Sequence, residues 1–309
     1  LAVILYNVCM GILQAVGDSR HPLYYLIFSS IVNIILDLVF CGAFRLGVEY
    51  AALATVISQM LSVVLCMIRL IRTQDVYQVS IREIRFDWPL LKQIIHQGLP
   101  SGMQNSIISI ANMVVQSNIN SFGKMAMAGC GAYSKIEGFG FLPITCFAMA
   151  MTTFIGQNLG AREFDRVKKG ARFGILCGVG LAEAVGIGIN LFIPQLIALF
   201  DRTPEVIQFG VTQAKIVTLF YFLLSFSHVI AGIMRGAGKS MVPMLVMLIS
   251  WCLIRITYVT ITIHFIPDIR VVFWAYPMTW TISSIIFLIY YKKADWIHYF
   301  DRQEEKQCA

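Results

Sequence analysis

Three polar residues in the first fifth of the chain have the types and spacing of a cation site. Asn33 and Asp37 lie four residues apart in the apolar segment 22–43, so a helix there presents both on one face. Thr55 lies in the next apolar segment, 48–70, which runs back in the opposite direction. At a rise of ~1.5 Å per residue, Asp37 and Thr55 are roughly 9 and 12 Å from the same end of this helix pair. A carboxylate, an amide and a hydroxyl that meet there suit H⁺ or a small hard cation such as Na⁺.

The cost of burying Asp37 favours a functional role. Its segment is long enough to cross a bilayer, where a charged side chain is expensive and marks a functional site by default. No lysine or arginine of residues 1–70 lies at the depth of Asp37, so we expect the carboxylate to meet a transported cation. The alternative, an acid that only fixes the packing of neighbouring helices, stays open.

A second set of polar residues predicts a substrate cleft. Glu137 is about ten residues into the segment 127–155, ~15 Å deep and near the bilayer midplane, where transporter substrate sites lie. Arg255 is in the segment 241–265, and we expect it to pair with an acid such as Glu137 or Glu183. The segment 97–121 is unusually polar, which indicates that it faces water rather than lipid. Its cleft candidates are Gln104, Asn105 and Asn112.

The composition predicts an all-α, polytopic membrane protein. The 309 residues are 58% hydrophobic and only 13% charged, against about 25% charged in soluble domains. Beyond a partial helix at 1–14, eight apolar segments are long enough to span a bilayer. They are 22–43, 48–70, 97–121, 127–155, 170–193, 206–234, 241–265 and 270–291. The eight cysteines have no metal-ligand spacing, so we expect no cofactor, and no metal other than Na⁺ at Asp37.

The basic residues predict the orientation of the chain. Of the 24 lysines and arginines, 17 fall in one set of alternate loops and in the tail, and four fall in the other set. Because cytoplasmic loops carry the excess of positive charge, the 17 mark the cytoplasmic side. The net charge of +7 is therefore a topology signal, and nucleic acid is not an expected partner. The tail, 293–309, is predicted to be cytoplasmic.

An internal repeat predicts two similar lobes. GILQAVGDSRHP at 11–22 aligns without gaps with GIMRGAGKSMVP at 232–243, and in each copy a turn joins two apolar segments. We expect residues 1–70 to belong to an N-terminal lobe, 71–95 to form an amphipathic cytoplasmic linker, and 96–292 to form a six-helix C-terminal lobe. The same six helices are then expected in the first lobe, of which most of the first four, about 130 residues by the repeat offset, precede Leu1. The sequence therefore resembles an N-terminally truncated protein.

These motifs together resemble the multidrug and toxic compound extrusion (MATE) family. They are the two glycine–proline turns, GLP at 98–100, and PITCFAMAMTTFIGQNLGARE at 143–163. The resemblance implies two pseudo-symmetric six-helix lobes and a monomer in the cell membrane. It implies an antiporter in which cation influx drives export of small amphipathic, often cationic, compounds. It also implies that Asn33, Asp37 and Thr55 belong to the cation site of the first lobe.

Two alternatives and one exclusion follow from the same residues. A lipid-linked precursor flippase of the same superfold needs a strongly cationic cavity, for which Lys135, Lys215 and Arg255 are the intramembrane candidates. A non-transporting fragment is the second alternative, because part of the cation site is expected to precede Leu1. An enzyme is not expected, because the predicted spans contain no second aspartate beside Asp37 and no partner for His228.

Overall fold

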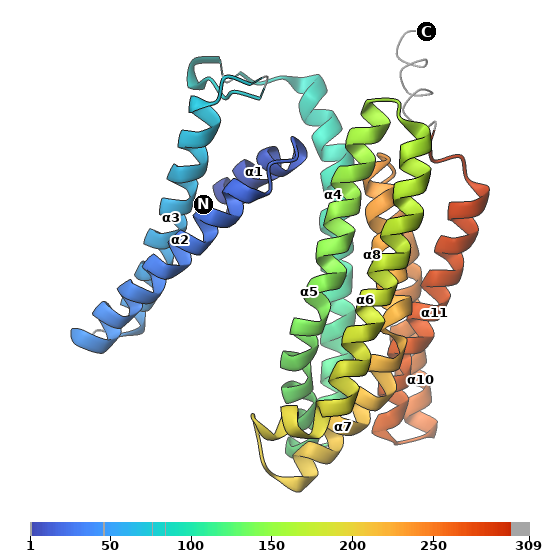
Figure 1. The fold of residues 1–309 in the computed structure, drawn as a ribbon. Helices are drawn as coiled ribbons and strands as arrows, with labels where there is room; N and C mark the ends of the chain where they lie inside the picture. The colour runs from blue at the N-terminus through green and yellow to red at the C-terminus, as the bar shows by residue number, and fades with distance from the viewer. Residues whose placement is uncertain (1, 46, 76, 84, 298–309) are drawn as a thin grey trace. The chain divides into compact units, whose positions relative to one another are not determined.

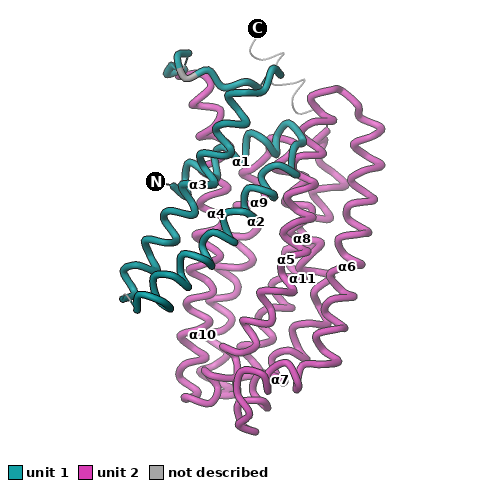
Figure 2. Tube along the Cα trace, turned by 60° about the vertical axis from the view of Figure 1, so that its left-hand side comes forward, with its two compact units in different colours: residues 1–87 teal, residues 88–309 magenta. Residues whose placement is uncertain are grey.

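The computed structural model describes residues 2–45, 47–75, 77–83 and 85–297, and the regular structure of these residues is helical (Figure 1). The chain divides into two compact units, Leu1–Asp87 and Trp88–Ala309 (Figure 2). The boundary between them falls within the segment 71–95 that was expected to link two lobes. Residues 298–309, most of the predicted tail, lie outside the described residues.

The first unit is a small helical hairpin with one further helix. It contains α1 (Ala2–Ala15), α2 (Arg20–Asp37), a π-helical continuation of α2 (Leu38–Ala43), α3 (Val48–Arg72) and one 3₁₀ turn (Ile81–Glu83). Both α1 and α2 pack against α3. The buried contacts of α1 with α3 involve Cys9, Leu13, Cys66 and Leu70, so two of the cysteines act as small apolar side chains.

The second unit is a bundle of long helices, several of which run side by side in Figure 1. In chain order they are α4 (Trp88–Asn120), α5 (Lys124–Gly160), α6 (Phe164–Ala198), α7 (Pro204–Val217), a 3₁₀ turn (Thr218–Phe220), α8 (Tyr221–Gly236), α9 (Met241–Met247), a π-helix (Leu248–Ile254), α10 (Arg255–Phe265) and α11 (Ile269–Lys293). Seven helical segments of the described chain are long and apolar enough to cross a membrane. The predicted all-α membrane class is confirmed.

The helix α4 differs from the expected span 97–121. It begins at Trp88, inside the predicted linker, and its 33 residues would extend ~50 Å at the usual rise. It is absent from the seven segments with high hydropathy, because polar residues occupy much of its length. A helix with this composition is suited to face a water-filled cleft rather than lipid.

The repeated sequence forms the same turn in each unit. In the first unit, Gly17 has a φ of 86°, and the Asp18 amide donates to the Leu13 carbonyl at 2.9 Å. In the second unit, Gly238 has a φ of 74°, and the Lys239 amide donates to the Met234 carbonyl at 2.8 Å. Glycine supplies the left-handed conformation that this way of ending a helix requires. The repeat is therefore present in the structure as well as in the sequence.

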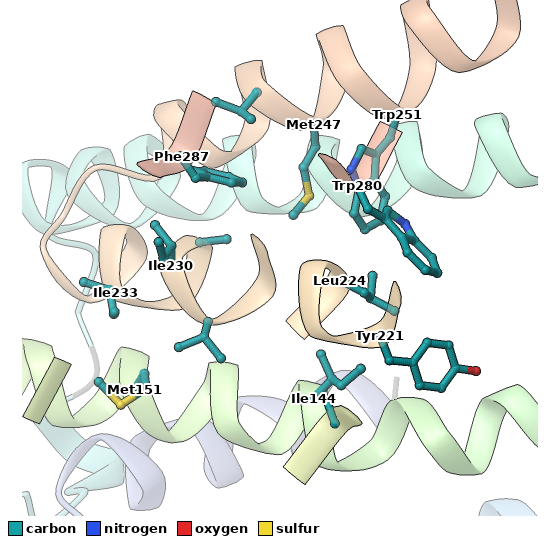
Figure 3. Close-up of a cluster of buried hydrophobic side chains, with 14 of the residues drawn as sticks. Ile144, Met151, Tyr221, Leu224, Ile230, Ile233, Met247, Trp251, Trp280 and Phe287 are labelled. Carbon is teal, nitrogen blue, oxygen red and sulfur yellow. The ribbon is translucent and has the colours of Figure 1, made fainter. Parts of the chain in front are cut away.

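The main core of the second unit surrounds α8. Figure 3 shows side chains of α8, including Leu224 and Ile230, between those of α5, such as Ile144 and Met151, and those of the last helices of the bundle. In the segment Pro204–Gly236, which ends with α8, 67% of the most apolar 18-residue stretch is buried. This helix is therefore the centre around which the polar residues of the second unit are placed.

Close packing of α5 and α8 depends on glycine at two positions one turn apart. A Cβ at Gly232 would overlap the carbonyl oxygen of Ala148, and one at Gly236 would be 2.5 Å from that of Thr152. The Thr152 hydroxyl also donates to the Gly232 carbonyl across the interface, at 3.0 Å. Small residues four apart permit such close approach of helices in membranes.

We predict that Gly232→Ala destabilises the protein by about 1–3 kcal/mol, because the added methyl group meets rigid backbone. Thermal unfolding in detergent would measure the effect. Gly131→Ala is the matched control on α5, because nothing lies within 4 Å of its Cβ position. It should be neutral or stabilise the helix by ~0.5–1 kcal/mol. Equal melting temperatures for the two variants would contradict the packing argument.

The turn before α2 contains an aspartate that stabilises the start of that helix. The Asp18 carboxylate accepts from the backbone amide of His21 at 3.3 Å and lies 2.6 Å from the His21 ring nitrogen Nδ1. Burial alone would raise the pKa of Asp18, but these hydrogen bonds and the nearby charges of His21 and Arg69 lower it below the ordinary value.

A pH-dependent effect of Asp18→Asn follows from the lowered pKa. We expect a loss of about 0.5–1 kcal/mol at neutral pH, as for a helix cap combined with a partly exposed ion pair. The contribution of Asp18 is present above the ordinary aspartate pKa of 3.8 and disappears as the pH falls through the lower pKa of the folded state. The free energies of unfolding of the wild type and of Asp18→Asn should differ less in acid than at pH 7. A difference that is the same at both pH values would contradict the prediction.

Candidate functional site

The first buried polar cluster of the second unit surrounds Glu137 on α5. Glu137 is half-buried, and the hydroxyl of Tyr133, one turn earlier, is its hydrogen-bond partner. Tyr133 is fully buried, and its hydroxyl lies 3.1 Å from that of Tyr221 at the start of α8. The hydrogen bond from the Tyr133 hydroxyl allows the Glu137 carboxylate to lie inside the bundle without a salt bridge.

Arg255, at the start of α10, is the charged residue beside this cluster. The residue is only 1% exposed. Its Nη2 and Nε donate to the Thr279 hydroxyl at 2.9 and 3.3 Å, and its Nη1 donates to the Asn112 side-chain oxygen at 3.3 Å. The guanidinium carbon also lies 4.7 Å from the ring centre of Tyr276 and 5.3 Å from that of Trp251. Aromatic faces stabilise a desolvated cation in this arrangement.

The predicted direct ion pair of Arg255 is wrong. Among the described residues, no carboxylate lies within ion-pair distance of Arg255, although Glu137 is near enough for the two charges to attract each other. Glu183 instead accepts from the backbone amide of Phe222 at 3.1 Å. The reason is that hydroxyl, amide and aromatic groups surround the guanidinium, so its donors are used without a carboxylate.

The three polar residues predicted on α4 lie in two different places. Gln104 is 2% exposed, its Nε2 is 2.8 Å from the Met247 sulfur, and its Oε1 accepts from Arg235 at 3.2 Å. Asn105 is exposed beside it, whereas Asn112, two turns later, contacts Arg255. The helix α4 therefore joins the Arg255 cluster to a second polar site around Gln104.

That second site is a cavity of about 490 Å³ between α4, α5, α8 and the π-helix that follows α9. Its polar lining includes Gln104, Asn105, His228 and Arg235, and its apolar lining includes Phe141, Met149 and Trp251. The His228 ring packs edge-on against Phe141 and Trp251. Its Nε2, however, has no hydrogen-bond partner in the described part of the chain.

In the first unit, two of the three predicted cation ligands have buried atoms without partners. The Asp37 Oδ1 and the Asn33 Nδ2 are shielded from solvent and make no hydrogen bond within the described residues. The Thr55 hydroxyl is occupied in its own helix, where it donates to the Ala51 carbonyl at 3.1 Å. Asp37 is also the last residue before the π-helical segment Leu38–Ala43, a distortion frequent at functional sites. A bound cation would satisfy the carboxylate oxygen.

Sequence reasoning missed Arg235 as part of a polar cavity. The residue stands near the cytoplasmic end of its span, beside Lys239, where a basic residue is ordinarily a topology signal. What distinguishes Arg235 from a loop cation is its hydrogen bond to Gln104, a polar residue 131 positions earlier in the chain. That pairing is visible only once α4 and α8 are packed.

Comparison with known proteins identifies the family. Residues 100–261, just over half of the chain, match the family model described as MatE. The chain belongs to the MATE family. This match runs from within α4 to the middle of α10 and therefore includes Glu137, Arg255 and the lining of the Gln104 cavity.

Individual MATE proteins are similar over most of this chain. A probable multidrug resistance protein of Bacillus subtilis, YpnP, is 28% identical over 94% of the chain and 65% of its own length. A probable multidrug resistance protein of Thermotoga maritima, NorM, is 27% identical over 78% of the chain and 52% of its own length. A crystal structure of MATE in complex with MaL6 superposes with a TM-score of 0.87 at 22% identity, over 94% of the chain and 66% of that protein.

These comparisons define what the chain is at the level of fold and class. It is a multi-pass membrane protein of a transporter family, not of an enzyme family. It spans about 65% of the length of the YpnP relative, and the structural likeness concerns the fold.

Proposed function

We propose that this protein is a cation-coupled antiporter that exports small amphipathic organic compounds from the cell. The observation that carries the proposal is the pair of buried atoms on one face of α2, the Asp37 Oδ1 and the Asn33 Nδ2, that have no hydrogen-bond partner among the described residues. A buried polar atom without a partner is costly, and a carboxylate that binds H⁺ or Na⁺ is relieved of that cost. The relatives named as multidrug resistance proteins support the export function.

The coupling follows from the charge on Asp37. Without a cation, a buried carboxylate favours the helix arrangement that gives it water or partners. With a cation, it is neutralised and the alternative arrangement is favoured, so cation influx biases the chain towards releasing its substrate outside. In this proposal the C-terminus is cytoplasmic, the protein acts as a monomer in the cell membrane, and Glu137, Arg255, Gln104, Asn105 and Asn112 belong to the substrate cleft.

A lipid-linked precursor flippase is the second candidate. It would carry a diphosphate through a strongly cationic cavity. The described lining of the Gln104 cavity contains one cation, Arg235, and Arg255 already donates to Thr279 and Asn112. Lys135 and Lys215, the other intramembrane candidates, are exposed on the helix surface. This distribution favours a small substrate over a diphosphate.

Transport in vesicles tests the proposal. The complete gene product would be reconstituted into proteoliposomes, and export of ethidium and of 2-naphthoate would be followed by fluorescence. We expect a proton or sodium gradient to accelerate the export of at least one probe, and an ionophore that collapses the gradient to abolish the acceleration. Export that is no faster than in protein-free vesicles under either gradient would refute the proposal.

A further inference from the structure

The Gln104 cavity of the second unit has a charge that the family comparison does not assign. Its lining comes from four helical segments, and its volume of about 490 Å³ lies within the ~300–1,000 Å³ of small-molecule pockets. The described lining contains one cationic side chain, Arg235, and neither aspartate nor glutamate. A cavity with one fixed positive charge and no carboxylate favours a ligand that has an anionic group.

Arg235 retains hydrogen-bonding capacity towards that cavity. The side chain is half-buried, and its contact with a side chain is the bond from Nη1 to the Gln104 Oε1, at 3.2 Å. A guanidinium has five N–H donors arranged in a fork that fits a carboxylate in two parallel bonds. Gln104 is itself buried and held at its Nε2 by Met247. The contact with Gln104 therefore orients the guanidinium and leaves other donors for a ligand.

The groups around Arg235 add polar and aromatic recognition. His228 lines the same cavity, and its Nε2 has no partner in the part of the chain that the structure describes. Trp251 and Phe141 form an aromatic wall on either side of the His228 ring, with centroid distances of 5.5 and 5.1 Å. Aromatic rings beside a fixed charge suit a ligand with a flat apolar body and one polar end.

Glu137 is an acid of α5 that precedes the lining residue Phe141 by one turn. It is not among the residues that line the cavity, and it is hydrogen-bonded to Tyr133 and attracted to Arg255. Its charge is thus offset by Arg255, whereas the charge of Arg235 has no such counterpart among the described residues.

We propose that the Gln104 cavity binds small amphipathic organic anions, with the anionic group on Arg235 and an aromatic body against Trp251 and Phe141. This deepens the proposed function, because it names the substrate class of the cleft in the second unit. It is separable from that function, because binding is measured at equilibrium and needs no cation gradient.

A matched series of ligands tests the proposal. The purified protein in nanodiscs of neutral phosphatidylcholine would be titrated with 2-naphthoate, 2-naphthylmethanol and 2-naphthylmethylamine, which share one aromatic body and differ in charge. Calorimetry or tryptophan fluorescence would give each Kd. We expect the acid to bind at least about ten-fold more tightly than the amine, a difference of about 1.4 kcal/mol. Equal or tighter binding of the amine would overturn the proposal.

Variants of Arg235 locate the charge. Arg235→Gln should raise the Kd of 2-naphthoate about ten-fold and leave the Kd of 2-naphthylmethanol nearly unchanged, because only the charge interaction is lost. Arg235→Lys, which keeps the charge, should retain the preference for the acid and guards against misfolding of the glutamine variant. Lys239→Gln is the control, because it removes one positive charge at the same end of α8 outside the lining. An equal loss in the Lys239 and Arg235 variants would refute the site.

Discussion

Cation-driven export should fall by roughly 5- to 150-fold in Asp37→Asn. This range corresponds to the loss of a typical coupling free energy of ~1–3 kcal/mol between two sites. Asparagine has the shape of the neutralised aspartate but cannot exchange a cation. The variant is therefore held permanently in the neutral condition, and the gradient no longer biases its arrangement. Export in proteoliposomes with and without a proton or sodium gradient would measure the change.

The stability of the same variant separates coupling from a structural role. The Asp37 Oδ1 is buried without a partner among the described residues, so removal of its charge should leave the melting temperature equal or higher. A structural ion pair would instead lose stability. Glu49→Gln is the matched control, because Glu49 is an exposed acid in the first turn of the neighbouring helix α3. Wild-type export by Asp37→Asn at normal expression would exclude the coupling role.

The second large effect is expected for Arg255→Gln. We predict that the free energy of unfolding falls by about 3 kcal/mol or more, because the change leaves the Glu137 carboxylate without its compensating charge inside the bundle. It also removes the donors to Thr279 and Asn112 and the contacts with Trp251 and Tyr276. Thermal unfolding of the purified protein would measure the loss.

A double variant identifies the cause of that loss. Arg255→Gln combined with Glu137→Gln removes both charges, and we expect it to be more stable than Arg255→Gln alone. Arg270→Gln is the control, because Arg270 is 70% exposed and lies 3.8 Å from Asp268, so its removal should cost about 0–1 kcal/mol. A double variant that is as unstable as the sum of the single variants would show that the two charges do not interact.

Much of the fold could be predicted because a membrane leaves few options. Apolar segments long enough to span a bilayer must be helical, since every backbone group needs an internal partner. The repeated GILQAVGDSRHP and GIMRGAGKSMVP turns were also predictable, because glycine at a fixed position ends a helix in one way. The length of α4 was less accessible, because polar residues that face a cleft weaken the hydropathy signal on which span prediction depends.

The polar sites were only partly predictable, for a different physical reason. Sequence spacing places Asn33 and Asp37 on one face of a helix, and each has a buried atom without a hydrogen-bond partner in the described part of the chain. Spacing does not reveal which helices meet. The partners of Arg255 are Thr279 and Asn112, at sequence separations of 24 and 143 positions, and a direct carboxylate partner was wrongly expected. Arg235 looked like a surface cation for the same reason.

Cation exchange at Asp37 is tested most directly by measuring the ion itself. The complete gene product would be sealed into vesicles with a pH- or sodium-sensitive dye, and an exported probe would be added on the side from which it is carried. The account predicts that the probe evokes a counter-movement of H⁺ or Na⁺ in the wild type and in Glu49→Gln, and none in Asp37→Asn. Probe transport without ion movement in the wild type, or unchanged ion movement in Asp37→Asn, would contradict it.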